Sequence, residues 1–125
     1  MPDENTGPVF DVAAFERQTG GDADLRHDII GMFLEDCPVR VAAVRAAVEQ
    51  RDATALVSAA HSLKGACGYL SAVAAREQAA HLEQIGRQGR MDEAEADAAL
   101  ARLDAAVAAL LPELRKQLSM RKRHA

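Results

Sequence analysis

One short stretch, from Ala60 to Leu70, combines residue types that can carry out chemistry. It contains His61 and, three residues later, Lys64. A free imidazole titrates near neutral pH, so one ring nitrogen is available as a nucleophile there. An ammonium group one helical turn away can offset negative charge on whatever group the ring accepts. The spacing therefore predicts a reactive histidine with a cationic neighbour.

The same stretch has the periodicity of a helix with two different faces. His61 lies about 140° away from the apolar stripe if each residue advances about 100°. Gly65, Gly68 and Ser58 fall on the same outward side as His61. A glycine inside a helix costs about 1 kcal/mol relative to alanine, and these two bring no evident folding benefit. We expect this face of small residues to let the backbone of another protein approach the ring. The apolar stripe consists of Leu56, Ala60, Leu63, Cys67 and Leu70.

Periodicity and capping residues along the rest of the chain predict helices joined by short links. Short links between long helices imply antiparallel neighbours. The fold class expected is all-α, an antiparallel up-down four-helix bundle with a short N-terminal helix as a lid. We expect a flexible tail over residues 1–8, the bundle domain over 9–118 and a basic tail over 119–125, with no role assigned to the basic cluster. The helices are expected at about 11–18, 23–51, 53–69, 72–88 and from 93 onward.

Single residues refine these boundaries. Asp22, Asp52 and Asp92 are expected to cap the helices that follow them, and Ser71 is expected to cap the helix from 72. Pro38 lies inside a hydrophobic stripe that continues in phase beyond it, which favours a kink over two separate helices. Pro112 should disturb the last turns of the final helix.

Composition excludes several classes of protein. Hydrophobic residues make up 49% of the 125 residues but aromatic residues only 3%, so the core must consist of small aliphatic side chains. The net charge of −4 argues against general nucleic-acid binding. No apolar run approaches membrane-spanning length, and the start lacks the pattern of a secretory signal. Cys37 and Cys67 fall on apolar stripes and are expected to be buried thiols of a reducing compartment, so we expect a cytoplasmic protein.

The sequence AHSLKGACGYLSA resembles the core of histidine-containing phosphotransfer (HPt) domains, the intermediates of phosphorelays. His61, Lys64 and Gly65 match the family pattern of a histidine, a lysine three residues later and a glycine four residues later. The resemblance extends to the phenylalanine-containing lead-in, the GGD turn and the HLEQI helix. The chain departs from the pattern at Ser71, where the family often has glycine, and at Cys67, where a smaller residue is common.

This resemblance implies a function and a set of roles. His61 would accept a phosphoryl group from a receiver aspartate or a kinase and pass it to a response-regulator aspartate. Lys64 would offset the charge of that group, and Glu83 would hydrogen-bond the other ring nitrogen and so orient His61. Gly65, Gly68 and Ser58 would give access to the partner. The partners implied are response-regulator receiver domains and a hybrid or sensor histidine kinase, with no nucleic acid, no membrane and a monomeric chain.

The sequence lacks a Walker-type phosphate loop and a carboxylate cluster near His61. We therefore expect neither an ATP site nor a metal or cofactor of the chain's own, and the resemblance implies a phosphotransfer intermediate rather than an enzyme. The Mg²⁺ and the remaining catalytic groups would come from the partner.

Three other functions are considered beside this one. A metal-binding bundle would need paired motifs, whereas the chain offers Glu77 with His81, Asp24 with His27, and a soft set of Cys37, Cys67 and His61 only if all three face inward. The phosphoacceptor helix of a sensor kinase usually has an acidic residue after its histidine, where this chain has Ser62. An adaptor bundle would bind partners without phosphorylation. For individual residues, Glu83 is alternatively a solvated flank residue, and His27, His81 and His124 are expected to be ordinary surface residues.

Overall fold

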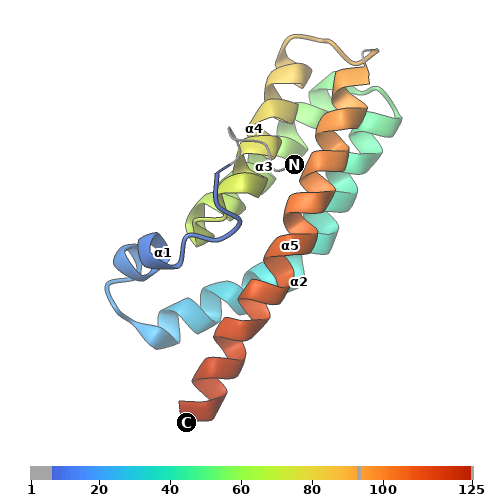
Figure 1. Ribbon diagram of the computed structural model, residues 1–125. Helices are drawn as coiled ribbons and strands as arrows, with labels where there is room; N and C mark the ends of the chain where they lie inside the picture. The colour runs from blue at the N-terminus through green and yellow to red at the C-terminus, as the bar shows by residue number, and fades with distance from the viewer. Residues whose placement is uncertain (1–6, 93, 125) are drawn as a thin grey trace.

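The computed structural model describes residues 7–92 and 94–124, without the side chains of 121–124, and these residues form five helices (Figure 1). Helices α2 and α3, α3 and α4, α4 and α5, and α5 and α2 pack against one another, which closes a ring of four antiparallel helices. The expected all-α four-helix bundle is confirmed. The helices are α1 (Val12–Gln18), α2 (Ala23–Glu49), α3 (Ala53–Leu70), α4 (Val73–Arg87) and α5 (Ala94–His124).

The first three helices begin at aspartate caps. The side chains of Asp11, Asp22 and Asp52 each accept a hydrogen bond of 3.0 Å from a backbone N–H three residues later. Each cap satisfies a backbone donor that has no partner within its own helix. Helix α1 then covers one end of the bundle through Phe15, whose side chain is buried.

Ser71 does not cap α4, so that prediction is wrong. Its backbone has φ 58° and ψ 38°, the left-handed conformation that ends α3, and its N–H donates to the carbonyl of Gly68. This conformation favours glycine, which has no Cβ to clash, and it accounts for the glycine that resembling sequences have here. Helix α4 instead starts after Ala72, which provides no side-chain cap.

The segment before α1 supplies the missing cap of α4. The carbonyl of Pro8 accepts a hydrogen bond of 2.9 Å from the N–H of Ala74, and the N–H of Gly7 donates to Oε2 of Glu77 at 3.1 Å. A Cβ at Gly7 would lie 2.3 Å from Cγ1 of Val73, so only glycine fits this approach. Of the tail expected over residues 1–8, residues 1–6 lie outside the described residues, whereas residues 7 and 8 are packed against α4.

Both prolines inside helices are accommodated. Helix α2 runs through Pro38 as one helix and changes direction along its length, as the kink hypothesis predicted (Figure 1). Pro112 does not interrupt α5, which continues to His124, so the expected disturbance does not break this helix. Pro112 is exposed, and the carbonyl that loses its helical donor there can bond to water. Residues 119–124, expected as a tail, therefore continue α5. The cap expected at Asp92 depends on residue 93, which lies outside the described residues.

Helices α3 and α4, which carry the candidate site, approach each other closely at Gly86. A Cβ at this position would lie 2.9 Å from Cγ2 of Val57 and 3.1 Å from the carbonyl oxygen of Ala53. The core around this contact is built from small aliphatic residues, and Cys37 and Cys67 are buried free thiols within it. Such close approach fixes the relative position of side chains one turn further along the two helices.

Candidate functional site

His61 projects from the middle of α3 into solvent. Its side chain is 65% exposed, whereas all five residues of the predicted apolar stripe on α3 are buried. The helix therefore presents the two faces that its periodicity predicted. The imidazole lies on the outer face, within reach of a group that approaches from solvent.

Glu83 comes from α4 and lies beneath the ring of His61. Its side chain is only 6% exposed, so it is not the solvated flank residue that periodicity alone permitted. Oε2 lies 3.2 Å from Nδ1 of His61 and 2.6 Å from Nη2 of Arg87, and Oε1 lies 2.8 Å from Nζ of Lys64. The structure thus brings the predicted His61 and Lys64 to the carboxylate of the predicted Glu83, and Arg87 joins them.

The electrostatics of this cluster determine which atoms of His61 can react. The contacts with Lys64 and Arg87, and the hydrogen bond with His61, lower the pKa of Glu83 to about 2 against the opposing effect of its burial. An ionised carboxylate can only accept hydrogen bonds, so Nδ1 of His61 must carry the proton. The neutral ring then has its free lone pair on Nε2. This assignment follows from the hydrogen-bond partners, since the contact itself does not distinguish the tautomers.

Lys64 does not extend freely beside the ring. Its ammonium group is bound to Glu83, and its side chain is 33% exposed.

Sequence reasoning missed Arg87 altogether. The signal was present, because Glu83 and Arg87 are four residues apart on one helix, a spacing at which opposite charges meet.

The small residues predicted for access leave open surface around His61. A Cβ added at Gly65 would contact nothing within 4 Å, and one at Gly68 would meet only Cδ of Arg76 at 3.8 Å. Ser58, one turn before His61, is exposed. The face of α3 around the ring therefore carries little side-chain bulk.

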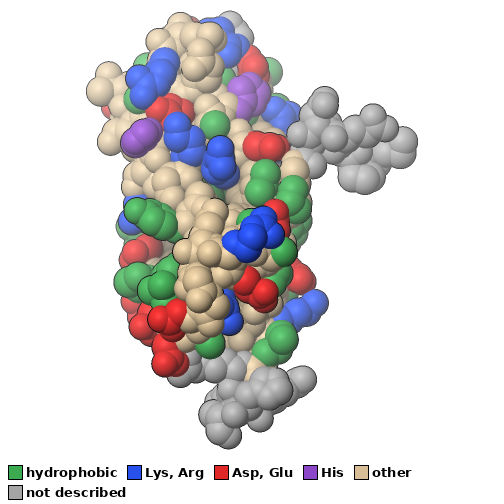
Figure 2. Space-filling model, turned by 90° about the vertical axis from the view of Figure 1, so that its left-hand side faces the viewer, with side chains coloured by type: hydrophobic (Ala, Val, Ile, Leu, Met, Phe, Trp, Pro, Cys, Tyr) green, Lys and Arg blue, Asp and Glu red, His purple; other side chains and the backbone are tan. Residues whose placement is uncertain are grey.

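A groove between α2 and α3 continues this surface, and the sequence did not identify its residues. Its volume is about 290 Å³, and its rim exposes Met32 and Tyr69, at 58% and 74%. On the face shown in Figure 2, several Lys and Arg side chains lie close to the two histidines in the upper part, with acidic side chains among them. The site thus combines cationic groups near the ring with an apolar groove further along α3. The groove is lined by Ile29, Met32, Phe33, Asp36, Arg40, Ala66, Tyr69 and Leu70.

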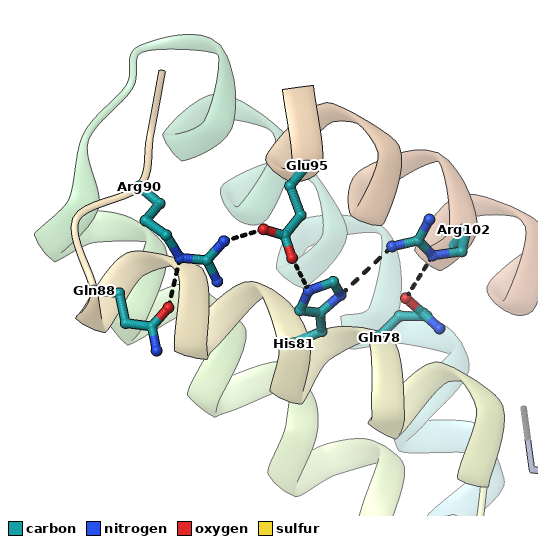
Figure 3. A network of polar contacts seen from close by, with 6 residues as sticks. All are labelled: Gln78, His81, Gln88, Arg90, Glu95 and Arg102. Carbon is teal, nitrogen blue, oxygen red and sulfur yellow. Dashed lines mark hydrogen bonds and ion pairs between the residues drawn. The ribbon is translucent and has the colours of Figure 1, made fainter. Parts of the chain in front are cut away.

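His81 belongs to a different cluster (Figure 3). Its Nε2 lies 2.7 Å from Oε1 of Glu95, and Nη2 of Arg102 lies 3.5 Å from its Nδ1. Arg90 also pairs with Glu95. These contacts join α4 to α5 and do not reach Glu83, in agreement with the expectation that His81 has no part in the site.

The alternative of a metal-binding bundle finds no support in the described part of the chain. Among the described side chains, those of residues 7–92 and 94–120, no three from His, Cys, Asp or Glu are grouped so that they could hold a metal ion. The soft set of Cys37, Cys67 and His61 fails because both thiols are buried in the core while the ring faces solvent. Within the same residues, no helix has the length and apolar character needed to span a membrane.

Comparison with known proteins shows the family of this chain and agrees with its fold. The model of the Hpt domain family matches residues 28–117. The crystal structure of histidine-containing phosphotransfer protein B (HptB) from Pseudomonas aeruginosa PAO1 is similar, with a TM-score of 0.80 and 23% sequence identity over 90% of this chain and 96% of that one. No curated protein matches the sequence.

The chain is a helical bundle, and the family match over residues 28–117 covers most of it. The protein belongs to the Hpt domain family, whose members transfer phosphoryl groups through a histidine in two-component phosphorelays. It is therefore a phosphotransfer intermediate, and proteins of this family interact with receiver domains and kinases in two-component relays.

Proposed function

We propose that His61 is the phosphoryl acceptor and that Nε2 is the atom that forms the bond. The observation that carries this proposal is the exposed ring whose Nδ1 contacts the ionised carboxylate of Glu83. A nucleophile needs a free lone pair directed at the incoming group, and the Nδ1–H tautomer provides it at Nε2. Positioning and charge neutralisation supply most of the catalysis in phosphoryl transfer.

The transfer step balances without a general base in this chain. The Nε2 lone pair attacks the phosphorus of an aspartyl phosphate, a P–N bond forms, and the P–O bond breaks with its electrons leaving on the aspartate carboxylate. The Nδ1 proton stays on the ring, which becomes a phosphoimidazolium beside Glu83. Because a cationic ring is a better leaving group than a neutral one, retention of this proton favours onward transfer to the next aspartate.

The rest of the active site would come from the partner. A receiver domain brings its acidic pocket and Mg²⁺, and a hybrid or sensor histidine kinase can be the alternative phosphoryl donor. The cationic groups of Lys64 and Arg87 near His61 suit an acidic pocket, and the apolar groove between α2 and α3 suits a partner's apolar surface. We further propose that the chain acts in the cytoplasm as a monomer, with neither an ATP site nor a cofactor of its own.

Phosphotransfer from a labelled receiver domain tests the acceptor. The wild-type chain, mixed with phosphorylated receiver domains and Mg²⁺, should take up label, and His61→Gln should abolish the uptake. His81→Gln is the matched control, since it removes a histidine outside the site and should retain the label. Label that persists on the His61 variant would refute the assignment.

Substitution of a small residue tests partner access. Gly65→Arg adds a side chain into open space, so we expect the fold to persist while transfer falls at least tenfold. Gly31→Arg is the matched control, because a Cβ at Gly31 would also meet nothing within 4 Å. Gly31 lies on α2, two residues after the groove residue Ile29. At about 100° per residue the two are about 200° apart around the helix, so Gly31 faces away from the groove. If both variants transfer equally well, the open surface around His61 is not the docking surface.

A further inference from the structure

The carboxylate of Glu83 is shared by two cations from different helices. Lys64 of α3 binds Oε1 at 2.8 Å, and Arg87 of α4 binds Oε2 at 2.6 Å, the same oxygen that contacts His61. A single cation would suffice to pair one carboxylate. The second cation is therefore not explained by the unphosphorylated state alone.

Phosphorylation of His61 changes the demand on these cations. A phosphoryl group on Nε2 brings about two negative charges close to Lys64, which is three residues away on the same helix face. If Lys64 turns toward the phosphoryl group, Oε1 loses its cation. A buried carboxylate left without a cation is strongly destabilised, because its desolvation is no longer offset.

Arg87 is placed to prevent that loss. It comes from α4, four residues after Glu83, so its contact with Oε2 does not depend on the position of α3 or of Lys64. Its side chain is 55% exposed, and it reaches the carboxylate from the solvent side. A guanidinium group remains charged at every pH relevant to the protein.

We propose that Arg87 is a positioning residue that keeps Glu83 ionised and bonded to Nδ1 of His61 when Lys64 is engaged by the phosphoryl group. This inference rests on the proposed function of His61. Its consequence is that Nδ1 of His61 keeps its proton, which it donates to Glu83, in both states of the ring, so the phosphorylated form remains ready for onward transfer. Lys64 and Arg87 thus have separable roles, one toward the phosphoryl group and one toward the carboxylate.

The coupling can be measured in the unphosphorylated protein, where Lys64→Met imitates the departure of Lys64. We compare Lys64→Met, Arg87→Met and the double variant by a ¹³C NMR pH titration of the Glu83 carboxyl and by ¹⁵N NMR of the His61 ring at about pH 8. Each single variant should keep the Nδ1–H tautomer, since one cation remains. The double variant should lose it and should raise the pKa of Glu83 by more than the sum of the single effects.

Two further variants separate positioning from folding. Lys64→Met with Arg87→Lys restores a cation beside Glu83 and should recover the Nδ1–H tautomer. Lys64→Met with Arg76→Met removes a different, exposed arginine of α4 and should leave the Nδ1–H tautomer unchanged. Retention of the Nδ1–H tautomer and of the low Glu83 pKa in the Lys64→Met/Arg87→Met variant would overturn the inference.

Phosphotransfer distinguishes this inference from the proposed function. With the coupling present, Arg87→Met should accept the phosphoryl group but pass it on at least fivefold more slowly than the wild type. Unchanged onward transfer in that variant would overturn the inference and leave the role of His61 intact. Coupling in the NMR experiment together with no phosphorylation of the wild type would overturn the proposed function instead.

Discussion

Glu83→Gln should reduce stability in a manner that depends on pH. The pKa of Glu83 falls from the ordinary value of 4.5 to about 2 in the folded chain, first because of Lys64 and then Arg87. At about 1.4 kcal/mol per pH unit, this difference corresponds to about 3 kcal/mol. The two cations are themselves partly exposed, so water screens the ion pairs, and we expect about 1–2 kcal/mol.

The sign follows from the direction of the pKa change. Because the folded pKa lies below the unfolded one, the stabilisation is complete above about pH 5 and is lost as the pH falls toward 2. The free energy of unfolding of the wild type should therefore exceed that of Glu83→Gln by about 1–2 kcal/mol at neutral pH. The difference should shrink to less than about 0.5 kcal/mol near pH 2.5.

Urea denaturation followed by circular dichroism at several pH values between 7 and 2.5 measures this difference. Glu113→Gln is the control, because Glu113 is an exposed residue of α5 in a surface ion pair with Lys116 and should change stability by at most about 0.5 kcal/mol. A difference between the wild type and Glu83→Gln that stays constant across this range would refute the reasoning, because the carboxylate would then not be held ionised by its neighbours.

Three further predictions concern the scaffold of the site. Gly86→Ala should lower the free energy of unfolding by about 1–3 kcal/mol because it forces α3 and α4 apart, whereas Gly31→Ala, in open space on α2, should raise it by up to about 1 kcal/mol; denaturant titration checks both. Burial raises the pKa of the Cys67 thiol to about 12, so the native protein should react with a thiol reagent at pH 8 only as fast as it unfolds, which absorbance measures. Gly7→Val should collide with Val73 and release the segment that caps α4, with faster amide hydrogen exchange in the first turn of that helix; unchanged exchange would contradict this.

Much of the fold could be predicted from the sequence because its signals are local. Asp22 and Asp52 cap their helices as expected, and the stripe from Leu56 to Leu70 is buried as its period required. Such features depend on a few neighbouring residues and on helix geometry alone.

Other features depend on contacts between segments that are distant in the chain. The local pattern predicts Ser71 as the cap of α4, but the start of α4 is capped by Pro8, more than sixty residues earlier. Glu83 is polar and interrupts the apolar period, so only the partners from α3 and from its own helix explain its burial. The pairing of Glu83 with Arg87 was within reach of sequence reasoning, whereas the groove between α2 and α3 required the packing of two helices.

Identification of the atom that carries the phosphoryl group tests the central claim most directly. The chain, labelled with ¹⁵N at histidine and phosphorylated by a receiver domain, can be examined by ³¹P and ¹⁵N NMR for scalar coupling between phosphorus and a ring nitrogen. The structure predicts coupling to Nε2 of His61, with the proton retained on Nδ1 beside Glu83. Coupling to Nδ1, or a phosphoryl group on any other residue, would contradict it.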